Sequence, residues 1–160
     1  MIWSTNRLLA LGIGMLLIAS AGCATDTYQQ RADLVKDHVE SFYGHLKANR
    51  VEAAVHENEQ IEAMATQMAD TVRKRAQQQG TTQVEREFAL MKTARDAAGQ
   101  NWLALAQYFS IKKQYPQARA TYQRIIETYT NDTERATRDQ AQRAIKDLDI
   151  LAPSASKPAS

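Results

Sequence analysis

Few residues in this chain can stop a helix, and their scarcity constrains the fold more than any other feature. Only six glycines and three prolines occur among 160 residues, whereas a β-sandwich needs both in its many turns. Clear breaks fall at Asn49, Gly80, Pro116 and Asn131. The sequence therefore predicts an all-α fold of antiparallel helical hairpins with long leading helices.

Apolar residues recur every three or four positions between these breaks, as an amphipathic helix requires. The predicted helices cover, approximately, residues 26–48, 50–79, 82–113, 116–129 and 133–150. A glycine costs about 1 kcal/mol relative to alanine inside a helix, which need not break it. At Gly99 the third helix therefore either continues or gives way to a new one.

The second predicted helix carries a narrow apolar seam. Its a and d positions in one heptad frame are Val51, Ala54, Asn58, Ile61, Ala65, Met68 and Val72. Because most of these side chains are small, we expect a closely packed hairpin partner rather than a deep core. Asn49 is predicted to cap the start of this helix, with Glu52 reaching back as in a capping box.

Similar stripes mark the helices on either side of it. The first helix has Leu34, Val35, His38, Phe42 and Leu46 at three-to-four spacing. The third has Val84, Phe88, Met91, Ala94 (or Arg95), Ala98 and Trp102. We expect these stripes to face the core.

The first 22 residues have the three parts of a secretory signal. Arg7 precedes an uninterrupted apolar run over 8–19, and the small residues Ser20, Ala21 and Gly22 follow it. Twelve helical residues span about 18 Å, which is too short for a hydrocarbon core of about 30 Å. We expect export rather than a transmembrane helix, although an uncleaved anchor remains an alternative.

The segment Ala19-Ser20-Ala21-Gly22-Cys23 resembles the lipobox of bacterial lipoprotein precursors. The resemblance implies removal of a signal peptide over 1–22 and a diacylglyceryl group on the thiol of Cys23. Leu is commonest three residues before the cysteine, where this chain has Ser20, so ordinary cleavage after Ala19 or Ala21 is the alternative. In enterobacterial lipoproteins an Asp after the cysteine favours the inner membrane, and Ala24 there leans toward the outer membrane.

Residues 99–132 span 34 positions and resemble one tetratricopeptide repeat. The matching packing positions are Trp102, Leu105, Ala106, Phe109, Tyr115, Ala118, Tyr122 and Ile125. Ile125 replaces the usual Ala, and Thr130 replaces the usual closing Pro. An ordinary helical hairpin with the same spacings is the alternative. Such repeats need neighbouring helices to bury their faces.

In that family the first helix of each repeat lines a groove that binds peptides or partner helices. Carried over by register, the groove residues are Gln100, Leu103, Gln107, Ser110 and Ile111. All five are neutral, so the resemblance implies a partner held by apolar and amide contacts. The alternative is that Leu103 and Ile111 pack on a neighbouring helix.

Several chemistries lack the residues they require. The single cysteine allows no internal disulfide. The segment His56-Glu57-Asn58-Glu59-Gln60 has Gln60 where a zinc-protease motif has its second histidine. The formal charge of +2 is spread along the chain, which does not suggest nucleic acid as a partner. We expect no metal, no cofactor and no enzymatic activity.

The expected mature domain covers residues 23–151, and a loose tail over 152–160 has too few apolar groups to fold. These features together predict a lipid-anchored protein that faces the periplasm, on the outer membrane rather than the inner one. It would bind another envelope protein as an adaptor or assembly factor. A self-associating structural spacer is the alternative.

Overall fold

The computed structural model describes residues 27–76 and 81–151, and every regular element in these ranges is helical. The elements are α1 (Thr27–Lys47), α2 (Val51–Ala76), α3 (Thr81–Ile111), α4 (Tyr115–Thr128), a short 3₁₀ helix η1 (Asp132–Glu134) and α5 (Arg135–Leu151). The prediction of an all-α fold built from helical hairpins is confirmed. The predicted signal peptide, Cys23 and the tail over 152–160 lie outside the described residues.

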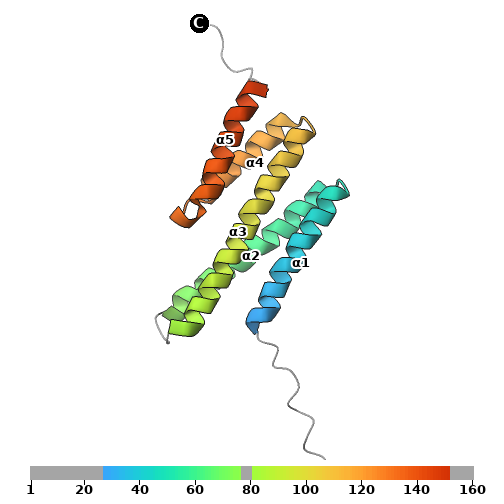
Figure 1. Cartoon of the computed structure of the whole chain (residues 1–160). Coiled ribbons are helices and arrows are strands. Elements are labelled where there is room, and N and C mark those ends of the chain that lie inside the picture. The colour runs from blue at the N-terminus through green and yellow to red at the C-terminus, as the bar shows by residue number, and fades with distance from the viewer. Residues whose placement is uncertain (1–26, 77–80, 152–160) are drawn as a thin grey trace, which may run out of the picture.

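The long helix α3 is the centre of the molecule and packs against all four other α-helices (Figure 1). The α1–α2 hairpin lies along one side of it, and the α4–α5 hairpin lies along its C-terminal half. The end of the bundle where α2 finishes and α3 begins extends beyond α4 and α5, and α1 starts near the same end. This arrangement leaves part of the α2–α3 pair without a covering helix.

Asn49 ends α1 instead of capping α2, so the predicted capping box is wrong. Its φ angle is 58°, in the left-handed region that Asn tolerates better than most residues. The Arg50 N–H donates to the His45 carbonyl at 2.9 Å, and the Asn49 N–H donates to that of Leu46 at 3.0 Å. These bonds satisfy the last carbonyls of α1 and reverse the chain, as in a Schellman motif.

The same closure ends α3 before Pro116 begins the next helix. Lys113 has a φ angle of 60°, and the Gln114 N–H donates to the Phe109 carbonyl at 2.8 Å. Pro116 then lies in the first turn of α4, where its missing N–H leaves no helical bond unmade.

The heptad seam predicted for α2 faces the core. Its five central members, Ala54, Asn58, Ile61, Ala65 and Met68, are all buried. Two other stripe residues were placed wrongly, because Leu34 is 46% exposed and Phe88 is 48% exposed. In α1 the neighbouring Val35 faces inward instead, and Phe88 lies on the part of α3 that no helix covers.

The third helix continues through Gly99, and a glycine suits this position because it is crowded by neighbouring side chains. A Cβ atom there would lie 3.2 Å from a ring carbon of Tyr129 and 3.2 Å from the methyl group of Thr137. Glycine therefore allows α3 to approach the start of α5 closely. This contact offsets the helical cost of glycine.

Candidate functional site

The groove predicted from the register of the repeat is not one surface. Gln100 and Gln107 are exposed and Ile111 is 81% exposed, but Leu103 is only 2% exposed. Ser110 is half-buried and contacts Tyr122 on α4 through its hydroxyl group. Helices on several sides of α3 cover the face that the resemblance left open. Leu103 is therefore a core residue, and the prediction of an exposed groove through it is wrong.

The packing positions of the 99–132 segment lie in or against the core. Trp102, Leu105, Ala106, Ala118, Tyr122 and Ile125 are buried. Phe109 and Tyr115 are partly buried and pack against the same cluster. The small residues Ala106 and Ala118, both fully buried, allow α3 and α4 to approach each other closely.

A cleft of about 530 Å³ opens between α2, α3 and the turn over residues 131–134. It is lined by Ala65, Thr66, Ala69, Asp70, Arg73, Phe88, Met91, Lys92, Arg95, Asp96, Asn131, Asp132, Thr133 and Glu134. Its volume is within the range of about 300–1,000 Å³ typical of ligand sites. Most of the lining residues are polar or charged, although apolar atoms provide the larger part of the lining surface, as is usual in ligand sites.

Apolar side chains in the cleft come from two facing helices. Ala65 and Ala69 lie one turn apart on α2, and Phe88 and Met91 lie on α3. Ala65 is buried in the core, whereas the half-buried Ala69 is small and leaves room for a guest to approach the backbone of α2. The half-exposed ring of Phe88 is the largest apolar group in this lining.

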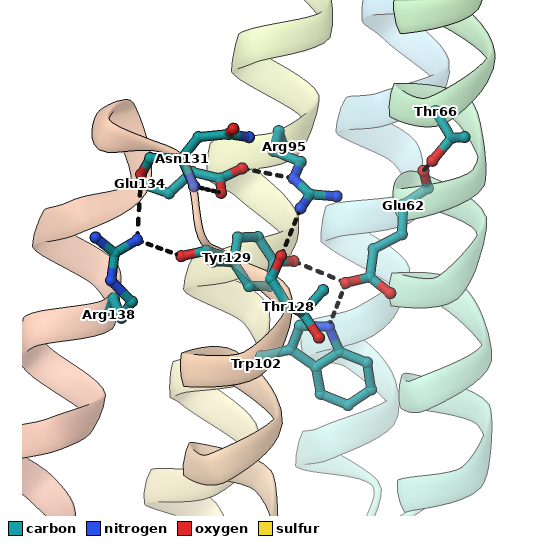
Figure 2. A network of polar contacts seen from close by, with 9 residues as sticks. All are labelled: Glu62, Thr66, Arg95, Trp102, Thr128, Tyr129, Asn131, Glu134 and Arg138. Carbon is teal, nitrogen blue, oxygen red and sulfur yellow. Dashed lines mark hydrogen bonds and ion pairs between the residues drawn. The ribbon is translucent and has the colours of Figure 1, made fainter.

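A hydrogen-bonded turn forms the third wall of the cleft (Figure 2). Glu134, which is almost fully buried, accepts a hydrogen bond from Arg95 Nε at 2.6 Å and another from the Asn131 N–H at 3.1 Å. Arg95 also donates to the carbonyl of Thr128 at 2.9 Å. Burial by itself lowers the pKa of Arg95, but the hydrogen bond and charge of Glu134 outweigh it and leave the pKa raised. The wall is therefore rigid and Arg95 stays charged.

A second network centres on Glu62 of α2, which joins the aromatic side chains of Trp102 and Tyr129 (Figure 2) and the basic side chain of Arg124. Its Oε1 accepts hydrogen bonds from Trp102 Nε1 at 2.9 Å and from the Tyr129 hydroxyl at 2.8 Å. Its Oε2 accepts one from Arg124 Nη2 at 3.1 Å. Burial, together with the negative charge of Glu62, raises the pKa of Tyr129 well above its usual value. This network attaches α3, α4 and the turn after α4 to α2.

Two carboxylates at one end of the cleft lack such partners. Arg95 pairs with Glu134, and Arg73 lies 3.7 Å from Asp70. Among the described residues, Asp96 and Asp132 form no ion pair or side-chain hydrogen bond. Both are exposed, so this end of the cleft presents negative charge to solvent.

A second polar cluster joins α1 to α2 and was missed from the sequence. Glu57 lies 2.6 Å from His38 Nδ1 and 3.7 Å from His45 Nε2. The signal was the seven-residue spacing of the histidines, which places both on one helix face. No group of three or more His, Cys, Asp or Glu residues within 27–76 and 81–151 is arranged to hold a metal ion.

The start of α1 is attached to the α2–α3 end by a shared carboxylate. Glu87 on α3 is 8% exposed and lies 2.9 Å from Arg31 on α1 and 3.2 Å from Arg75 on α2. These contacts fix where the chain enters the bundle. In the described part of the chain, no helix is both long and apolar enough to cross a membrane.

No protein-family model matches the chain, and no curated protein or solved structure matches it either. The resemblances to lipoprotein precursors and to a tetratricopeptide repeat therefore rest on the residues quoted for them.

Proposed function

We propose that this protein is a lipid-anchored, periplasm-facing adaptor of a bacterial envelope, and that it holds a second envelope protein in the cleft between α2, α3 and the 131–134 turn. The observation that carries the docking site is Phe88, which is 48% exposed within a concave, three-walled surface. Exposed aromatic groups in such surfaces are typical anchors of protein–protein contacts. Because ion pairs and hydrogen bonds hold the cleft walls, a partner pays little to order them.

The anchor supplies the mechanism. Two or three acyl chains on Cys23 hold a protein firmly to a bilayer, whereas one chain binds only marginally. Confining the cleft to a membrane surface raises its effective concentration for a partner in the same compartment. Cys23 begins this tether, and α1 starts only four residues later. Ala24 favours the outer membrane as its location.

The anchor is tested on the precursor. Globomycin, or the Cys23→Ala substitution, should leave an unprocessed and unlipidated chain. Normal processing of Cys23→Ala would reject the lipid anchor, although the cleft would remain a docking site to be tested separately.

Docking is tested by a photo-crosslinking amino acid at Phe88 of the full chain in intact cells. The matched control is the same amino acid at Ile111, which is also apolar, exposed and on α3 but does not line the cleft. We expect a distinct protein to be linked from position 88 and not from position 111. Self-adducts alone would favour the structural spacer, and no adduct at position 88 would reject docking in the cleft.

A further inference from the structure

We infer that the guest of the cleft is an amphipathic helix that lays an apolar stripe against Phe88 and directs a lysine or arginine toward Asp96 and Asp132. The inference rests on the proposed docking function and names the chemistry of the partner. Three properties of the cleft carry it, namely its helical walls, the distribution of its apolar groups and its unpaired carboxylates.

The walls favour a helix because α2 and α3 run antiparallel side by side (Figure 1), and the cleft is lined by about two turns of each. The helices α4 and α5 cover the C-terminal half of α3, and the turn before α5 closes one end of the cleft. A guest helix in the open part would extend the layer that α4 and α5 form. The half-buried Ala69 on α2 allows the close backbone approach that such packing needs.

The apolar groups form a stripe rather than an enclosed pocket. Phe88 and Met91 lie one turn apart on α3, and Ala69 lines the same cleft from α2. Charged side chains border them, so a guest must combine an apolar face with polar flanks. An amphipathic helix offers this combination along one side through residues three and four apart.

Charge sets the direction of the guest. Two ion pairs in the lining, Arg95–Glu134 and Arg73–Asp70, are neutral overall. The other charged residues of the lining are Lys92, Asp96 and Asp132. Asp132 belongs to the turn that closes the cleft, and Asp96 lies two turns beyond Phe88 on α3. A basic side chain at that end of the guest would find two carboxylates that are free to pair.

The test measures the adduct formed from the photo-crosslinking residue at position 88 in a charge-reversed background. We expect Asp96→Lys combined with Asp132→Lys to reduce the adduct at least about fivefold, because like charges across an interface repel. The matched control is Asp37→Lys combined with Asp147→Lys. It makes the same change in net charge on exposed residues outside the cleft lining and should leave the adduct unchanged.

Mass spectrometry of the adduct identifies the linked segment of the partner. This identification allows a charge-swap experiment with variants of both proteins. We expect a helical segment with a Lys or Arg near the linked residue, and reversal of that residue to Glu should restore the adduct in the Asp96→Lys, Asp132→Lys background. If the amount of adduct does not change on charge reversal, or if the linked segment has no basic residue, the inference is wrong but the proposed adaptor function is not affected. Absence of any adduct to a second protein overturns both. Unchanged thermal unfolding of each variant shows that the fold is retained.

Discussion

Removing the carboxylate of Glu62 should weaken the bundle more than removing any exposed charge on α2. Glu62 is 16% exposed and is the acceptor for two donors in the core. Those donors belong to Trp102, which is 3% exposed, and Tyr129, which is 1% exposed. In Glu62→Ala, both are left without an acceptor and out of reach of bulk water.

The expected loss follows from these two orphaned groups. A buried donor without a partner costs about 1–3 kcal/mol. Because Glu62→Ala leaves two such donors, we expect it to lower the free energy of unfolding by about 2–6 kcal/mol. Glu62→Gln keeps an acceptor oxygen and loses the charge facing the half-exposed Arg124, so it should cost only about 1 kcal/mol.

The assay is chemical unfolding of the purified full chain, followed by far-ultraviolet circular dichroism. Glu59→Ala is the matched control, because Glu59 lies one turn away on α2 and 3.9 Å from the same Arg124, but is 48% exposed. Its loss should stay below about 1 kcal/mol. Equal losses for Glu59→Ala and Glu62→Ala would refute the argument that orphaned donors, rather than charge, set the cost.

Three further predictions concern single positions. Gly99→Ala should destabilise the fold by about 1 kcal/mol or more, because its Cβ atom would crowd Tyr129. Gly44→Ala should stabilise α1 by about 0.5–1 kcal/mol, because a Cβ atom there would have nothing within 4 Å. Thermal unfolding midpoints that shift in the same direction for both variants would contradict this. Because the pKa of Tyr129 is raised in the fold, its contribution is complete below pH 10, the ordinary tyrosine pKa, and is lost as pH rises above it. Tyr129→Phe should flatten the decline in the free energy of unfolding above about pH 10, and an unchanged slope there would exclude this cause. Asn49→Ala should lower the free energy of unfolding by about 1 kcal/mol because of the left-handed φ angle at this position, and Asn49→Gly should lower it less. Equal unfolding midpoints for the two variants would contradict this.

Much of the fold could be predicted from local patterns. The breaks at Gly80, Pro116 and Asn131 bound the observed helices to within a few residues, because turn residues act through backbone geometry that depends little on distant contacts. The heptad seam of α2 was also predicted correctly, from Ala54 to Met68. Small side chains at heptad spacing favour close packing against another helix.

The site was harder to predict because one helix can pack on several sides. Leu103 has the position of an exposed groove residue in the register of a repeat, yet neighbouring helices bury it. Phe88 belongs to an apolar stripe, yet it lies where α4 and α5 do not reach. Periodicity tells which residues share a face of a helix, but it does not tell which faces find a partner.

The sequence by itself determined the helices, the α2 seam and the residues expected to carry the anchor, since each depends on near neighbours in the chain. Only the tertiary structure decided where the surface lies open. Asp96 and Asp132 are separated by 36 positions and meet in one cleft, because the chain reverses after α4 and the Glu62 and Glu134 networks hold that turn against α2 and α3. Long-range packing of this kind leaves no local pattern, and the candidate docking site depends on it.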